Sequence, residues 1–294
     1  MRSKYKSIIL SIIIFTLGYE ASQNDFFPIN QFFERHFAKD KTPEALVEPT
    51  PVQAAYYLYS DVSNKQSVEC PTPDNTFVVA TFGQSNAANG LGQKFVDETE
   101  SIINFFNGYC YLASDPTLGA AGEQGSIWIP FLQQLNVEKT ILSVNFAVGG
   151  SSINRWLNSD DLGQVLSENM QALADSDYKP DLFMWFQGES EAYKDASVFE
   201  ERLETLISRL ETDHPTAAIG ISGTTYCSQR IDKNIVNVQK RVALSRDHIW
   251  LGSTDDFISL QHRYDDCHLS GLGATEVATM FANSVNNYLQ KNAN

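Results

Sequence analysis

The sequence predicts an α/β domain with a mainly parallel central sheet. After residue 75, short apolar runs alternate with longer segments of helical periodicity, which is typical of strand-helix-strand units. The composition is that of a globular protein, with 43% hydrophobic and 19% charged residues, so disorder and fibrous repeats are excluded. We therefore expect one domain over residues 75–294.

Five apolar runs are predicted to be strands of this sheet, because strands covered by helices on both faces are apolar throughout. They comprise residues 76–82, 139–148, 181–186, 217–222 and 248–252. Residues 102–113 interrupt the alternation, since Asn107 and Gly108 stand between two apolar segments. This pattern indicates an inserted β-hairpin.

Helical spacing of apolar residues predicts three helices between and after the strands. They cover residues 162–174, 198–210 and 273–289. Ser197 precedes the second helix and Glu200 follows three residues later, which is the pattern of a capping box.

The N-terminus has the layout of a secretory signal. Arg2, Lys4 and Lys6 precede an apolar run over residues 8–17. We expect residues 1–21 to be a signal peptide or a signal anchor. The run is short for a membrane span, yet it is followed by a poor cleavage site, so both alternatives stay open.

The N-terminal signal predicts export to the periplasm or secretion. Residues 22–74 differ in composition from the rest of the chain, because prolines separate short aromatic stretches. We expect this segment to be a loosely structured leader or linker before the domain.

The net charge of −15 at pH 7 limits the partners of the protein. Such a charge repels nucleic-acid backbones and anionic lipid surfaces. We expect no nucleic-acid partner, and membrane contact only through an uncleaved N-terminal segment. The sequence leaves the oligomeric state open.

The four cysteines are interpreted as disulfides, because export favours them over free thiols or metal ligands. Four cysteines allow three connectivities. We favour Cys70 with Cys110 and Cys227 with Cys267, which closes two loops of equal length. Four free buried thiols are the alternative.

Polar clusters follow three predicted strands, and a fourth precedes the last helix. Ligands of open α/β sheets bind beyond the carboxyl ends of the strands, so these clusters are the candidate site. They are Gly83-Gln84-Ser85-Asn86, Gly149-Gly150-Ser151-Ser152, Gln187-Gly188-Glu189-Ser190 and Asp265-Asp266-Cys267-His268.

Together the clusters supply the parts of a serine esterase. Ser85 is the candidate nucleophile, although a glycine turn with a serine cap would look the same in isolation. Asp265 stands three residues before His268, a spacing that lets the carboxylate accept from the imidazole N–H. Gly150 lets a backbone N–H approach a reacting atom.

These four motifs resemble the SGNH (GDSL-like) hydrolases, in the branch of sialate O-acetylesterases and acetylxylan esterases. The resemblance covers residues 76–289 in the family's order. It implies a flavodoxin-like three-layer α/β/α sandwich and no cofactor. It also implies that Ser85 is the nucleophile, His268 the general base and Asp265 the orienting acid.

The resemblance further implies an oxyanion hole formed by the N–H groups of Ser85 and Gly150 and by the Gln187 amide. Gln187 stands where most of the superfamily has an asparagine. Glu189 of the Gln-Gly-Glu motif competes with Asp265 as the triad acid, and the sequence leaves the two open.

Asn86, Arg155 and Trp156 are candidates for substrate binding. An arginine can bind a carboxylate through bidentate hydrogen bonds, and an indole stacks on sugar faces. This combination suits an acidic sugar. An ordinary helix start with Trp156 in the core is an equal alternative. The glycine-rich residues 119–125 lack a phosphate-loop pattern and are interpreted as a flexible rim of the site.

The remaining histidines show no ligand spacing, and we expect no metal site. They are His36, His214, His248 and His262.

The leading functional hypothesis is an exported enzyme that removes O-acetyl groups from a carbohydrate through an acetyl-enzyme intermediate. The substrate is expected to be an acetylated sialic acid or polysaccharide, and acetyl transfer to a sugar stays open beside hydrolysis. The first alternative is a catalytically silent protein that binds surface glycans or assists polysaccharide assembly. The second is a lipase or thioesterase on the same fold.

Overall fold

The computed structural model describes residues 58–246 and 249–292, which lie within one compact unit spanning Pro49–Asn294. The predicted signal segment 1–21, residues 22–57 of the predicted leader, His36 and His248 lie outside the described residues. Among the described residues, no helix is long and apolar enough to span a membrane.

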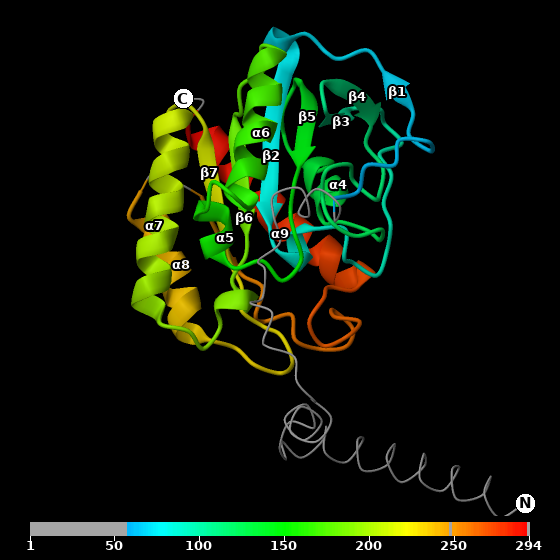
Figure 1. Ribbon diagram of the computed structural model, residues 1–294. Helices are drawn as coiled ribbons and strands as arrows, with labels where there is room; N and C mark the ends of the chain where they lie inside the picture. The colour runs from blue at the N-terminus through cyan, green and yellow to red at the C-terminus, as the bar shows by residue number, and fades with distance from the viewer. Residues whose placement is uncertain (1–57, 247–248, 293–294) are drawn as a thin grey trace, which may run out of the picture. The chain divides into compact units, whose positions relative to one another are not determined.

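One eight-stranded sheet forms the centre of the unit, with the strand order β1-β4-β3-β5-β2-β6-β7-β8 (Figure 1). In this spatial order, each pair of neighbouring strands from β3 through β5, β2, β6 and β7 to β8 is parallel. Strand β4 pairs antiparallel with β3 and with β1. The strands are β1 Ser67–Val68, β2 Thr76–Gly83, β3 Ile102–Phe106, β4 Tyr109–Leu112, β5 Thr140–Asn145, β6 Leu182–Phe186, β7 Ala218–Gly223 and β8 Ile249–Ser253. The mainly parallel sheet predicted from the apolar runs is therefore confirmed.

Helices cover both faces of the sheet (Figure 1). The α-helices are α4 Trp128–Leu132, α5 Ile153–Leu157, α6 Leu162–Asp175, α7 Ala196–Asp213, α8 Lys233–Leu244 and α9 Gly271–Asn292. The short 3-10 helices are η1 Pro73–Asn75, η2 Ser85–Ala87 and η3 Glu189–Glu191. Helices α5 to α8 pack on one face, and α4 and α9 pack on the other. This is the predicted three-layer α/β/α sandwich.

The side chains of β2 alternate between the two layers of the core. Val78, Ala80 and Phe82 pack with the α5 to α8 layer, and Val79 packs with the α4 and α9 layer. The ring of Phe82 is fully buried and lies 4.8 Å from the Trp185 ring, between centroids. Burying one such side chain contributes about 1.5–3 kcal/mol to the free energy of unfolding, so this packing stabilises the central strands.

The predicted hairpin is confirmed, since β3 and β4 pair around a turn at Asn107 and Gly108. Both turn residues have positive φ, 51° and 82°, as a two-residue turn with right-handed strand twist requires. The cap of α7 differs from the prediction. Asp195, not Ser197, is the N-cap, and its side chain accepts from the Ser197 backbone N–H at 2.9 Å.

Within residues 58–74, where we expected a loosely structured leader, Ser67–Val68 form the outer edge strand of the sheet. Ser67 and Val68 pair with Tyr111 and Cys110 of β4, and Cys70 is bonded to Cys110. Proline-rich composition is typical of linkers, but prolines are also compatible with a short edge strand. Backbone pairing with β4 and the Cys70–Cys110 disulfide hold this segment against the sheet.

The structure pairs Cys70 with Cys110 and Cys227 with Cys267, the connectivity favoured from the spacing. The first bond fastens the edge strand β1 to β4. The second joins the loop after β7 to the loop before α9, with the two Cα atoms 4.2 Å apart. Two disulfides suit an oxidising compartment.

Candidate active site

Ser85 lies directly beyond the carboxyl end of β2, in the turn η2. Gly83 makes this turn possible, because its φ is +140° and a β-carbon there would lie 2.0 Å from the Phe186 carbonyl oxygen. Ser85 is half-buried. The parallel neighbours β5 and β6 end at the same edge, so the loops that follow them are adjacent to this serine.

His268 and Asp265 form a tight pair in the loop before α9. The imidazole Nδ1 of His268 lies 2.7 Å from Oδ2 of Asp265, and the other carboxylate oxygen accepts from the His268 backbone N–H at 2.7 Å. Partial burial alone would raise the pKa of Asp265, but the hydrogen bonds from His268 lower it below its usual value. The carboxylate is therefore ionised and oriented toward the ring.

Ser85 and His268 approach each other around Gly90. A β-carbon at Gly90 would lie 3.0 Å from the Ser85 carbonyl oxygen and 4.0 Å from Cδ2 of His268. On the other side of the serine, a β-carbon at Gly149 would lie 3.6 Å from Cβ of Ser85. The structure thus brings together the predicted nucleophile, the predicted base and the glycine turn after β5.

Gly150 occupies the exposed end of that turn, with a φ of +67° and open space where a side chain would stand. The preceding residue, Gly149, lies against Ser85, so the backbone N–H groups of Ser85 and Gly150 belong to adjacent turns. Such a pair of donors is what an oxyanion hole requires.

The Gln187 amide does not take the place expected for a third oxyanion donor. Gln187 is fully buried, and its Nε2 donates to the Ser151 carbonyl at 3.3 Å and to Glu191 Oε1 at 3.2 Å. The backbone carbonyl of Gln187 accepts from Gln239 Nε2 at 2.7 Å. The longer side chain, compared with asparagine, folds back into the protein and fixes the loop after β6 instead.

Glu189 does not contact the histidine, which separates the two candidate acids. Its Oε1 accepts from Asn86 Nδ2 at 2.8 Å and from Thr224 Oγ1 at 3.0 Å. Burial raises the pKa of Glu189 above its usual value, against the lowering effect of the Asn86 hydrogen bond. Asp265 is the carboxylate that contacts the imidazole.

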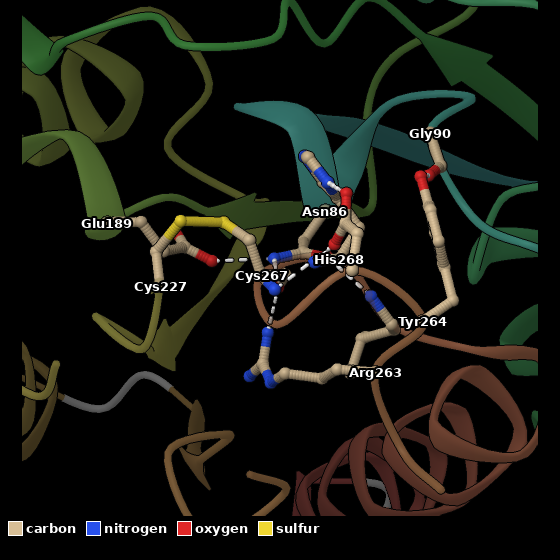
Figure 2. Close-up of polar contacts among 10 residues, drawn as sticks. Asn86, Gly90, Glu189, Cys227, Arg263, Tyr264, Cys267 and His268 are labelled. Atoms are coloured by element: carbon tan, nitrogen blue, oxygen red, sulfur yellow. Dashed lines mark hydrogen bonds and ion pairs between the residues drawn. A yellow bond between two sulfur atoms is a disulfide. The ribbon is translucent and has the colours of Figure 1, made fainter. Parts of the chain in front are cut away.

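We expected Asn86 to bind substrate, whereas its side chain is fully buried. Besides Glu189, its side chain contacts the loop that carries the base (Figure 2). Nδ2 lies 3.4 Å from the Cys267 carbonyl oxygen, and Oδ1 accepts from the Leu269 N–H at 3.1 Å.

Arg155 and Trp156 also differ from the substrate-binding expectation. Arg155 donates twice to Asp161, at 2.6 and 2.8 Å, so its guanidinium is already paired with a carboxylate. Trp156 is 1% exposed, packs against Trp185 and donates its indole N–H to Ser151 Oγ at 2.9 Å. The indole of Trp156 therefore lies in the core, which was the alternative to substrate binding.

Sequence reasoning missed three residues that build the site. Tyr264 stacks on His268 and donates to the Gly90 carbonyl at 2.9 Å. Arg263 is fully buried and donates to the Cys267 carbonyl. Asn89 is buried and donates to the carbonyls of Thr117 and Ala120. The positions of Tyr264 and Arg263 just before the Asp265 motif were the available signal.

Asn89 also changes the interpretation of residues 119–125. The segment is hydrogen-bonded on several sides, since the N–H groups of Gly119 and Ala121 donate to the carbonyls of Tyr59 and Ala147. It is a fixed loop beside the site, where we expected a flexible rim. Within residues 58–246 and 249–292, no group of three His, Cys, Asp or Glu side chains is placed to hold a metal ion.

The two remaining described histidines have other partners. Burial lowers the pKa of His214, which packs against Phe183, and His262 contacts Glu276 at 3.1 Å.

Solved structures with a similar fold include two with TM-scores above 0.5. A protein from Arabidopsis thaliana has a TM-score of 0.57 and 18% identity, covering 74% of this chain and 98% of its own. NanS has a TM-score of 0.53 and 13% identity, covering 76% of this chain and all of its own. No curated protein matches the chain significantly. A family model for "carbohydrate esterase, sialic acid-specific acetylesterase" matches residues 75–287, and the chain therefore belongs to this carbohydrate esterase family.

Proposed function

We propose that the protein is an exported carbohydrate O-acetylesterase with Ser85 as nucleophile, His268 as general base and Asp265 as the acid that orients the base. The observation that carries the proposal is the 2.7 Å contact between His268 Nδ1 and Asp265, in a position where Gly90 lies against both the His268 ring and the Ser85 carbonyl. The family match supports an acetylated sugar as the substrate class.

The reaction follows from these positions. His268 accepts the Ser85 hydroxyl proton while Oγ attacks the acetyl carbonyl, and Asp265 stabilises the imidazolium that forms. The backbone N–H groups of Ser85 and Gly150 hold the oxyanion. Collapse of this intermediate releases the sugar hydroxyl, which takes the proton from His268. Water then attacks the acetyl-enzyme by the same route and releases acetate.

The pairing of Arg155 with Asp161 bears on the choice of sugar. An acidic sugar such as a sialic acid needs a cation for its carboxylate, and this guanidinium already holds one. The proposed catalytic residues therefore do not require an acidic sugar as substrate. A neutral acetylated polysaccharide fits the same catalytic residues.

Export is part of the proposal. The two disulfides suit an oxidising compartment, and the basic and apolar N-terminal residues have the layout of a signal. A cleaved signal peptide gives a secreted or periplasmic enzyme, and an uncleaved one gives an anchored enzyme.

The test is acetate release by the full chain and by its Ser85→Ala and His268→Ala variants. Substrates are 4-nitrophenyl acetate, O-acetylated sialic acids and acetylated xylo-oligosaccharides. We expect release by the wild type and only background release by both variants. Ser208→Ala removes an exposed serine of α7 and should release acetate at the wild-type rate.

Two results would overturn the proposal. Background release from every acetylated sugar, with binding of the same sugars, would indicate a silent glycan-binding protein. Release from long-chain acyl esters in preference to acetyl esters would indicate a lipase or thioesterase.

A further inference from the structure

Asn86 holds the backbone on both sides of His268. Its Nδ2 lies 3.4 Å from the carbonyl oxygen of Cys267, and its Oδ1 accepts from the N–H of Leu269 at 3.1 Å. Asn86 is also the residue directly after Ser85. One buried side chain therefore links the nucleophile turn to the two peptide groups that flank the base (Figure 2).

Glu189 fixes which way the Asn86 amide points. Oε1 of Glu189 accepts from Thr224 as well as from Asn86, and an oxygen that carries no proton only accepts, so the amide nitrogen faces Glu189 Oε1 at 2.8 Å. With the nitrogen on that side, the amide oxygen faces the Leu269 N–H. A flipped amide would set two acceptors against each other and two donors against each other, and would lose both contacts.

Neighbouring groups keep Glu189 and the base loop in place. Thr224 Oγ1 donates to the same carboxylate oxygen as Asn86, at 3.0 Å. The fully buried guanidinium of Arg263 donates to the Cys267 carbonyl and attracts the Glu189 charge. Burying a carboxylate in this way costs free energy, which a purely structural loop would not require.

We propose that Glu189 is a positioning residue which, by orienting Asn86, sets the place of His268 relative to Ser85. This inference rests on the proposed function for its substrate assay. It assigns to the Gln-Gly-Glu glutamate an action through the backbone of the base loop, separate from the triad acid role of Asp265.

The test compares Glu189→Gln, Asn86→Ala and the double variant Asn86→Ala/Glu189→Gln in the full chain. The amide introduced by Glu189→Gln can donate as well as accept, so the Asn86 amide is no longer held in one orientation. We expect kcat to fall about 10- to 100-fold in Glu189→Gln with KM unchanged, which corresponds to about 1.4–2.7 kcal/mol. The double variant should be no slower than Asn86→Ala alone, because Glu189 acts through Asn86.

A second readout does not need any sugar. The rate at which a fluorophosphonate labels Ser85 depends on the placement of His268, and Glu189→Gln should slow it by a similar factor. Asp115→Asn is the matched control, since Asp115 is another buried, hydrogen-bonded carboxylate but lies outside this network. It should leave both rates unchanged.

The outcomes are distinguishable. Labelling of Glu189→Gln at the wild-type rate would overturn the positioning role, even if its melting temperature falls. A severe loss in Glu189→Gln together with a mild loss in Asp265→Asn would make Glu189 the triad acid instead. If the wild-type protein is labelled but releases no acetate, the proposed function is refuted. The positioning role is then decided by comparing the labelling rates of wild type and Glu189→Gln. If Glu189→Gln does not fold, Thr224→Val removes the other donor to Glu189 and should slow labelling in the same direction.

Discussion

The phenol ring of Tyr264 lies over the imidazole of His268, with ring centroids 6.0 Å apart and ring planes inclined by 23°. Its hydroxyl donates to the Gly90 carbonyl at 2.9 Å, and its backbone N–H donates to the His268 carbonyl at 3.0 Å. Tyr264 thus connects the segment after Ser85 with the loop that carries His268. About half of its surface is exposed, so it also forms a wall of the site.

Removing the Tyr264 ring should lower kcat. Tyr264→Phe loses one hydrogen bond worth about 1 kcal/mol, and we expect a decrease of about fivefold. Tyr264→Ala loses the stacking as well and should decrease kcat further, with a higher KM if sugars contact the exposed ring face. The measurement is the kinetics of acetate release, with Tyr109→Ala on β4 as an exposed tyrosine control. An unchanged kcat in Tyr264→Ala would contradict the prediction.

The two disulfides should separate stability from activity. Both close loops of the same length, with a sequence separation of 40, so each should contribute about 3–4 kcal/mol to the free energy of unfolding. Only Cys267 precedes His268 and offers its carbonyl to Asn86 and Arg263. We expect Cys227→Ser/Cys267→Ser to lose activity while still folded.

The matched variant is Cys70→Ser/Cys110→Ser, which opens the remote edge-strand disulfide. Urea unfolding should give similar decreases in the free energy of unfolding for the two double variants. Acetate release below the unfolding transition should fall only in Cys227→Ser/Cys267→Ser. Equal activities in the two folded variants would mean that the disulfide does not hold the base loop.

Arg155 should not determine the preference for acidic sugars. Its guanidinium is held by Asp161 through two hydrogen bonds, so an acidic substrate would have to displace a carboxylate. We expect Arg155→Met to leave the ratio of KM values for acetylated sialic acid and acetylated xylose unchanged. The ion pair is partly exposed, so the stability loss should stay below about 1 kcal/mol. A selective rise in KM for the acidic sugar would restore Arg155 as a substrate ligand.

The fold could be predicted from the sequence because its strands are apolar on both faces. The run at residues 76–82 becomes β2, Thr76–Gly83, and the other four predicted strands are also found with shifted ends. The short helices α4 and α5 and the edge strand β1 carry too few residues for a periodic signal. Their formation depends on packing and on the Cys70 disulfide.

The proposed acid and base could be found in the sequence because they lie close together along the chain, whereas the residues that support them could not. Asp265 and His268 contact each other within one turn of chain, so their spacing, together with the other polar clusters, indicated the pair. Asn86 and Glu189 are 103 residues apart, and Tyr264 and Gly90 are 174 apart. Only the order of strands in the sheet brings such partners together, and the sequence does not contain that order locally.

Asp115 should make stability depend on pH in the direction opposite to most carboxylates. Burial raises the pKa of Asp115 to about 7, even though Phe95 and Ser126 donate hydrogen bonds to it. In the unfolded chain an aspartate titrates near pH 4. Between these values the folded protein binds more protons at this carboxyl, so its contribution to the free energy of unfolding decreases as the pH rises from about 4 to about 7.

Comparison with Asp115→Asn isolates this contribution, because asparagine does not titrate. The stability of Asp115→Asn relative to wild type should increase between pH 4.5 and pH 7.5 in urea unfolding, by about 3 kcal/mol. Lys65 gives an independent check. Its charge lowers the pKa of Asp115, so Lys65→Met should extend the loss of stability to higher pH. A stability difference between wild type and Asp115→Asn that does not change with pH would show that the carboxyl titrates normally in the folded protein.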